Sequence, residues 1–100
     1  ITNLQYLLLL QVKGYPGREW AFVGELAERL QAHQLGVGSL GSRCEKLGLV
    51  ERRPGRDDRR AVEVHLTPAG ERLVARIAER HRRELKELEA VFPQVAARLR

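Results

Sequence analysis

The chain has 100 residues, of which 43% are hydrophobic, and a formal net charge of +5 at pH 7. A chain of this length forms one small domain with a modest core, so association with a second copy is a natural source of further burial. The basic residues are 15 Arg and 3 Lys, an excess that favours a polyanionic partner. One cysteine excludes an internal disulfide, and no apolar run is long enough for a membrane span or a signal peptide, so we expect a cytoplasmic protein without a membrane partner.

Residues 3 to 13 predict a helix that is apolar on nearly every side. Such a helix must be covered by more than one neighbour. Gly14, Pro16 and Gly17 end it, and residues 20 to 22 predict a short strand against a later hairpin. Because the chain begins at Ile1 and contains no methionine, we expect a further N-terminal segment before it.

Two short helices follow. Helical spacing over about residues 22 to 32 is shown by Trp20, Val23, Leu26, Ala27 and Leu30. A turn is expected at residues 33 to 36, and then a second helix closed by Gly48, with an apolar stripe of Val37, Leu40, Cys44 and Leu47. On this stripe Cys44 is interpreted as a small buried thiol; a redox sensor is the alternative, since Arg43 and Lys46 lie nearby.

Residues 49 to 70, LVERRPGRDDRRAVEVHLTPAG, predict a β-hairpin with an arginine-rich loop. Its first run stops at the turn pair Pro54-Gly55. In the second run, alternation places Val62, Val64 and Leu66 on one face and Glu63 and His65 on the other. Like charges crowded in a loop repel each other unless an anion is expected there, which favours DNA over a merely solubilising loop. Two short helices followed by a hairpin are the order of elements in a winged helix.

Thr67 and Pro68 are typical of the N-cap and first residue of a helix. A long helix is expected from there to about Pro93, and residues 94 to 99 could add a short terminal helix. Arginine and glutamate cover one side of the long helix, which predicts a dimerisation helix with a solvated outer face. The dimerisation stripe comprises Leu73, Ile77, His81, Leu85, Leu88 and Phe92.

The chain resembles the MarR (multiple antibiotic resistance regulator) family of bacterial transcription factors over nearly its whole length. The similar segments are LQYLLLL, VGELAERLQ, EKLGLVERRP and DRRAVEVHLTPAGERL, and the most specific motif is Asp58-x-Arg60 followed by Leu66-Thr67-x-x-Gly70. The resemblance implies a homodimer on a pseudo-palindromic operator and an additional N-terminal helix at the dimer interface. It also implies that Asp58 holds Arg60, which reaches into the minor groove.

We therefore predict a mainly α-helical single domain over residues 1–100 with a small β-wing. Its winged helix-turn-helix core covers residues 18–67, and residues 1–13 and 68–100 supply helices for packing and dimerisation. We expect a sequence-specific, double-stranded-DNA-binding transcription regulator, a dimeric repressor released by a small-molecule effector or a modification. The alternative is a winged helix used as a protein-protein interaction or assembly module.

The candidate DNA-binding residues are Gly36, Gly38, Ser39, Ser42, Arg43, Arg53, Arg56, Asp58, Arg59 and Arg60. Glycine offers no side chain to read a base, so we expect readout in the major groove to depend on Ser39, Ser42 and Arg43, assisted by the wing and by DNA shape. The chain has no glycine-rich phosphate loop after a strand and no nucleophile motif, which argues against an enzyme. No cofactor is expected, and no metal either, since the three histidines lack ligand spacing.

Overall fold

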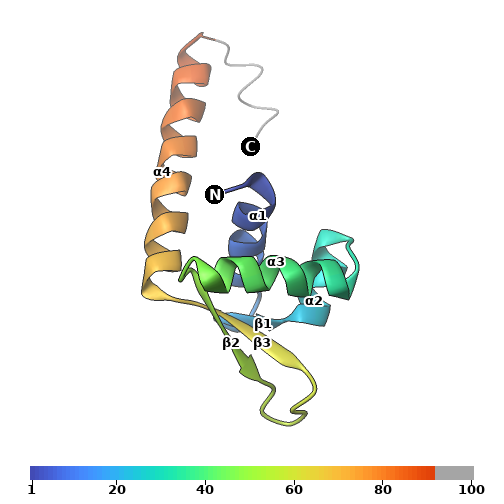
Figure 1. Ribbon diagram of the computed structural model, residues 1–100. Helices are drawn as coiled ribbons and strands as arrows, with labels where there is room; N and C mark the ends of the chain where they lie inside the picture. The colour runs from blue at the N-terminus through green and yellow to red at the C-terminus, as the bar shows by residue number, and fades with distance from the viewer. Residues whose placement is uncertain (92–100) are drawn as a thin grey trace.

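The computed structural model describes residues 1–91, which form four α-helices and a three-stranded antiparallel sheet. Helix α1 (Asn3–Lys13) stands between the long helix α4 and the pair α2 and α3, and the sheet lies below them (Figure 1). The predicted fold class, a mainly α-helical winged helix-turn-helix, is confirmed. None of the helices in this part of the chain is both long and apolar enough to cross a bilayer.

Helix α1 begins with a reciprocal cap. Gln5 N–H donates to Thr2 Oγ1 at 3.1 Å, and Thr2 N–H donates to Gln5 Oε1 at 3.0 Å. Leu8, Leu9 and Val12 are fully buried, whereas Leu4 is 64% exposed. The expectation that more than one neighbour covers α1 is confirmed, because α1 contacts α2, α3, α4 and the sheet, although the side that carries Leu4 remains open within residues 1–91.

Helices α2 (Val23–Leu30) and α3 (Gln34–Lys46) form the helix-turn-helix pair. Gln31 adopts a left-handed conformation, φ 53°, and ends α2. The turn expected at residues 33 to 36 is wrong, because α3 begins at Gln34. The first turn of α3 does not touch the core, so apolar periodicity starts only at Val37, three residues inside the helix. At the other end, Gly48 has φ 75° and follows the C-cap as predicted.

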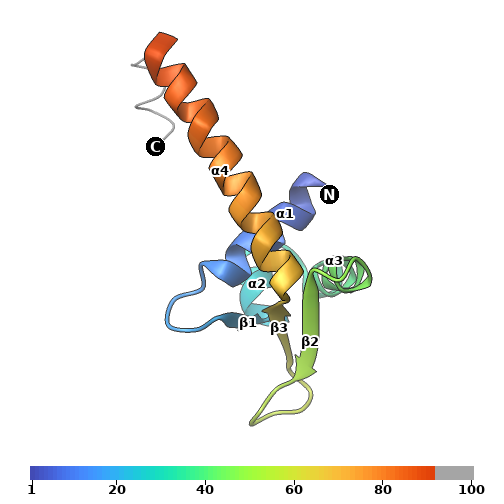
Figure 2. The same cartoon turned by 90° about the vertical axis from the view of Figure 1, so that its left-hand side faces the viewer.

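The sheet joins β1 (Trp20–Phe22), β2 (Val50–Pro54) and β3 (Val62–Leu66) in the order β1-β3-β2. The short strand predicted at residues 20 to 22 pairs with β3, so Trp20 lies opposite His65 and does not extend the apolar stripe of α2 as its spacing suggested. Ala21 and Val64 point into the core. The β2–β3 hairpin extends away from the helices as the wing (Figure 2).

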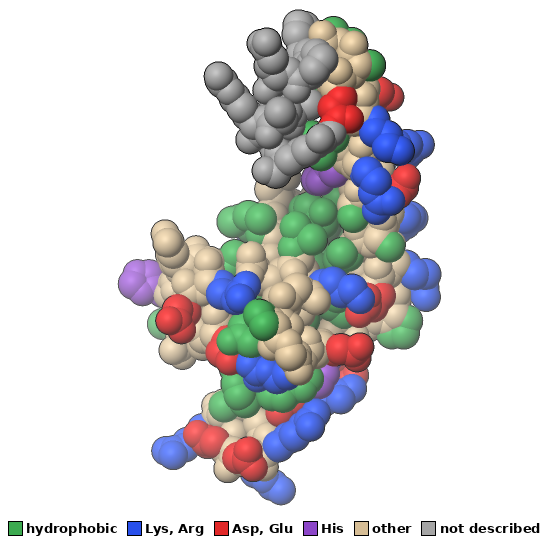
Figure 3. Space-filling model, turned by 180° about the vertical axis from the view of Figure 1, so that it is seen from behind, with side chains coloured by type: hydrophobic (Ala, Val, Ile, Leu, Met, Phe, Trp, Pro, Cys, Tyr) green, Lys and Arg blue, Asp and Glu red, His purple; other side chains and the backbone are tan. Residues whose placement is uncertain are grey.

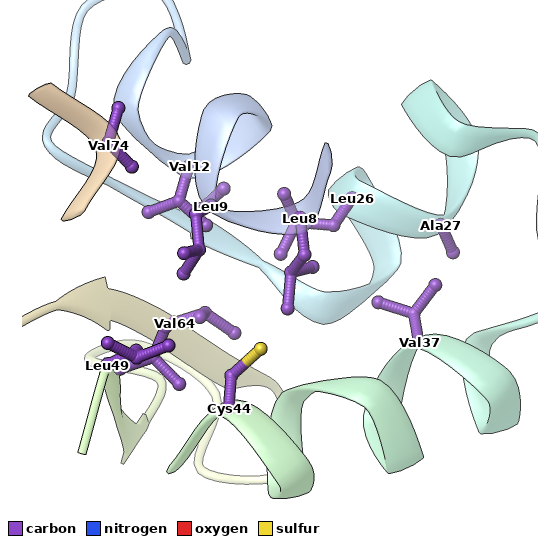
Figure 4. Packing of buried hydrophobic residues seen from close by; sticks show 12 residues of the cluster. Leu8, Leu9, Val12, Leu26, Ala27, Val37, Cys44, Leu49, Val64 and Val74 are labelled. Atoms are coloured by element: carbon purple, nitrogen blue, oxygen red, sulfur yellow. The ribbon is translucent and has the colours of Figure 1, made fainter. Parts of the chain in front are cut away.

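The core is a single cluster of apolar side chains from every helix and from the sheet (Figure 4). Leu8 and Leu9 of α1 point toward Cys44 of α3, and Val74 joins from α4. Cys44 is buried, and burial raises the pKa of its thiol above the ordinary value, which disfavours the reactive thiolate. The structure thus favours the buried thiol over the redox sensor.

Helix α4 (Pro68–Val91) begins as predicted, with Gly70 N–H donating to Thr67 Oγ1 at 3.1 Å. Its first half packs on α1, where Lys13 Nζ lies 2.7 Å from Glu71 Oε2 and the rings of Tyr6 and His81 meet edge to face. Gly70 is required here, since a Cβ atom would lie 2.1 Å from the Leu49 carbonyl oxygen. Phe92 and the terminal helix expected at 94 to 99 lie outside the described residues.

Candidate nucleic-acid interface

Helix α3 presents one face to the core and the opposite face to solvent. Val37, Gly41 and Cys44 are buried. At 100° per residue, the centre of the opposite face contains Leu35, Ser39, Ser42 and Lys46. Of these, Leu35, Ser39 and Lys46 are exposed and Ser42 is half-buried. We call these four residues the outer face of α3.

The structure distributes the predicted residues of α3 over three positions. Ser39 and Ser42 lie on the outer face. Gly38 borders the side next to the wing, where a hollow of about 600 Å³ also contacts Arg52 and Arg60. On the other side, Gly36 and Arg43 line a groove against α1. The sequence analysis missed Leu35 and Lys46, which helical spacing would have revealed had the start of α3 been placed at residue 34.

The wing loop is held in a compact turn by its own backbone. Gly55 N–H donates to the Ala61 carbonyl at 2.8 Å, and Ala61 N–H donates to the Asp58 carbonyl at 3.1 Å. A Cβ atom on Gly55 would lie 2.3 Å from the Asp58 carbonyl oxygen, so only glycine fits this position. The loop therefore presents residues 56 to 60 in a defined shape.

Asp58 and Arg60 are brought together at the tip of the wing. Asp58 Oδ1 accepts a hydrogen bond of 3.0 Å from the Arg60 backbone N–H and lies 3.5 Å from Arg60 Nε. The Arg60 side chain is nevertheless 94% exposed, so its guanidinium is oriented by Asp58 while remaining open to solvent. Arg59 is also exposed and has no ion-pair partner among residues 1–91.

The other wing arginines are engaged with carboxylates. Arg53 forms a bidentate salt bridge with Glu51, in which both N–O distances are 3.1 Å. Arg56 folds back, with Nε 3.7 Å from Glu63 Oε2 and its guanidinium 5.3 Å from the centre of the Trp20 ring. These two predicted DNA-binding residues are thus less available than Arg59 and Arg60.

Arg52 connects the wing to α3, a link that the sequence analysis missed. Its backbone N–H donates to Glu45 Oε2 at 3.0 Å, and its Nε donates to Glu45 Oε1 at 3.3 Å. Strand alternation places Arg52 on the α3 side of β2, opposite Val64. The Arg52–Glu45 pair therefore sets the position of the wing relative to α3.

The sheet face that points away from the core holds a buried carboxylate. Glu63 is only 2% exposed, and its carboxylate contacts His65 and Arg56, whose side chains in turn pack against the Trp20 ring. The hydrogen bond from His65 and the charge of Arg56 hold the pKa of Glu63 below its ordinary value, although burial acts in the opposite direction. Alternation correctly predicted the face of Glu63 but not its burial.

Lysine and arginine side chains lie along the outer side of α4 and over the wing, and hydrophobic side chains show between them beside α4 (Figure 3). Near the outer face of α3, Arg43 and Lys46 have no ion-pair partner within residues 1–91. The wing and α3 thus combine uncompensated cations with hydroxyl groups of Ser39 and Ser42 at one end of the molecule.

No group of three His, Cys, Asp or Glu suited to a metal ion occurs within residues 1–91.

The chain is similar to known transcriptional regulators in both sequence and structure. Among curated proteins, the uncharacterized HTH-type transcriptional regulator YsmB of Bacillus subtilis is 29% identical over 80 residues, which is 74% of this chain and 55% of that protein. The chain thus spans about half the length of this relative. The relative is a regulator and not an enzyme.

Solved structures share the fold. A MarR family protein from Bacillus stearothermophilus has a TM-score of 0.80 at 24% identity, covering 99% of this chain and 66% of that one. A mutant MarR of E. coli complexed with operator DNA has a TM-score of 0.70 at 26% identity, with coverages of 76% and 52%. A transcriptional regulator from Thermotoga maritima has a TM-score of 0.76 at 27% identity, with coverages of 90% and 61%. The sequence pattern that defines the MarR family also matches residues 1–61, which is more than half of the sequence. The chain therefore belongs to the MarR family.

Proposed function

We propose that the protein regulates transcription by binding double-stranded DNA in a sequence-specific manner as a homodimer. The observation that carries the proposal is the adjacency of the outer face of α3, with Ser39, Ser42 and the free cation of Lys46, to a wing whose Arg60 is held open by Asp58. A helix of 13 residues is about 20 Å long and fits the major groove.

The wing suits a second contact beside that groove. Arg60 projects from the tip with its guanidinium free on all sides except toward Asp58. A cation on a narrow projecting loop can enter the minor groove, where the negative potential is high. The solved MarR of E. coli is complexed with operator DNA, and we extend DNA binding to the present chain.

Dimerisation would use the solvent-exposed side of α1 and the C-terminal half of α4. Leu85 and Leu88 on α4 lie beyond the contact with α1 and border a hollow together with His81. Leu4 and Leu7 of α1 are exposed as well. Burying these side chains against a second copy would add the apolar area that a single small domain lacks. Two α3 helices would then reach successive major grooves of a pseudo-palindromic operator.

A small effector could act through the groove between α1 and α3. Its volume is about 390 Å³, within the range of small-molecule sites. Leu7 and Leu40 give it apolar walls, and Arg43 and Ser39 border it from α3. A ligand bound there would contact the same helix that we assign to the major groove. We therefore propose a repressor that an effector releases from DNA.

Selection of bound sequences from a random duplex pool, using the full-length protein, tests the proposal. We expect enrichment of one pseudo-palindromic site, and tighter binding to that site than to a scrambled duplex of the same composition at 0.15 M salt. Weak binding that is indifferent to sequence would contradict the proposal and favour the interaction-module alternative.

A further inference from the structure

Leu35 is the most exposed large hydrophobic side chain among residues 1–91, at 90%. It lies in the first turn of α3, on the outer face and therefore away from the buried Val37 and Cys44. Leu35 contributes nothing to the core of the chain. Its exposure leaves the side chain available to a partner that binds this face.

The surroundings of Leu35 are unusually open. Gly36 and Gly38 flank it, and a Cβ atom at either glycine would have no neighbour within 4 Å. Leu35 also borders the hollow between α2, α3 and the wing, which Arg52 and Arg60 line from the wing side and Glu25 and Glu28 line from α2. The side chain thus projects from a stretch of bare helix backbone, with arginines across the hollow.

The charge of this rim indicates which occupant fits. A single leucine across a hollow from charged side chains offers little to an apolar protein surface, because docking such a surface would desolvate the exposed guanidinium of Arg60. A duplex supplies phosphates near the open guanidinium of Arg60. In the major groove it also presents one apolar group, the C5 methyl of thymine. The absent side chains of Gly36 and Gly38 would let the edges of the bases approach closely enough for this contact.

We propose that Leu35 is a specificity-determining residue that selects thymine by contact with its C5 methyl group. This inference rests on the proposed function and adds an apolar contact to the readout by Ser39 and Ser42. It also gives the two glycines a role, since a longer side chain at either position would hold the bases away from Leu35. The glycine-rich start of α3 would then favour thymine-containing half-sites instead of weakening selection.

Deoxyuridine, which lacks only the C5 methyl group, provides the test. A binding site is first selected from the random pool, and each thymine of one half-site is then replaced by deoxyuridine in turn. We expect the unmutated protein to bind about fourfold more weakly when the methyl that contacts Leu35 is removed, the factor for about one buried methylene group. Leu35→Ala should bind the thymine duplex more weakly and lose its sensitivity to that replacement.

Leu47→Ala is the matched control, because Leu47 is also exposed but lies at the C-cap of the same helix. This variant should keep the sensitivity to deoxyuridine, and both variants should melt at the temperature of the unmutated protein. If a site is selected but no deoxyuridine replacement matters, or if Leu35→Ala remains equally sensitive, the role of Leu35 is wrong and the proposed function stands. If no sequence is selected, both fail.

Discussion

Glu63 accepts a hydrogen bond of 2.8 Å from His65 Nε2 on the sheet face that points away from the core. Because the pKa of Glu63 is lowered in the fold, its ionised form stabilises the protein at pH values above the ordinary carboxyl pKa of 4.5. This contribution is lost as the pH falls through the lowered pKa. Glu63→Gln should therefore be less stable than the unmutated protein near neutral pH, and the difference should shrink in acid.

Urea unfolding of both proteins at a series of pH values checks this prediction. Glu87→Gln, a change at an exposed position of α4, serves as the control and should follow the unmutated protein throughout. If the free energies of unfolding of Glu63→Gln and the unmutated protein differ by the same amount down to pH 3, the charge of Glu63 contributes nothing to stability.

Two glycines should respond to alanine in opposite directions. Gly70→Ala should destabilise the protein by about 1 to 3 kcal/mol, because the new methyl group would collide with the Leu49 carbonyl oxygen at the start of α4. Gly38→Ala should stabilise it by up to about 1 kcal/mol, since Gly38 lies in α3 with open space around it. Thermal melts of the two variants measure both effects. Loss of stability in Gly38→Ala would argue that the helix geometry assigned there is incorrect.

Removing the charge of Arg60 should weaken DNA binding without unfolding the protein. Arg60→Ala should also flatten the dependence of log K on log salt by up to about 0.9, as expected when one cation near the phosphates no longer releases counterions. Asp58→Ala should weaken binding too, because Arg60 loses both its backbone and its side-chain contact with Asp58. Gel-shift titrations at several salt concentrations test this, with Arg80→Ala on the exposed side of α4 as the control. Equal affinity of Arg60→Ala and Arg80→Ala for the selected duplex would remove Arg60 from the interface.

A charge on the apolar side of α4 should disrupt the dimer. Leu88→Glu would place a carboxylate in the proposed contact between the two copies and should dissociate the dimer, and with it weaken operator binding. Ala90→Glu, which lies 200° around the helix, should leave association unchanged. Sedimentation at micromolar concentration distinguishes them. If the unmutated full-length protein already sediments as a monomer, the paired half-site proposal is wrong.

Local sequence patterns were sufficient to predict the elements that local interactions define. The alternation around Val64, the N-cap at Thr67 and the C-terminal glycine at Gly48 each depend on contacts within a few residues, and the structure confirms all three. The order of helices and hairpin then led to the winged helix. The proximity of Asp58 to Arg60, which the resemblance to the MarR family implied, is likewise a contact between near neighbours in the sequence.

Only the tertiary structure decided which side chains are buried and which are free. Arg56 reaches Glu63 from the wing loop, and the Trp20 ring from β1 packs against both Arg56 and His65, so no local pattern contains the burial of Glu63. Arg52 is tied to α3 by Glu45, while Arg53 next to it is neutralised by Glu51. The first turn of α3 extends past the core, so apolar periodicity could not mark its start or the exposure of Leu35. Periodicity reports which residues meet the core, whereas a binding surface consists of residues that do not.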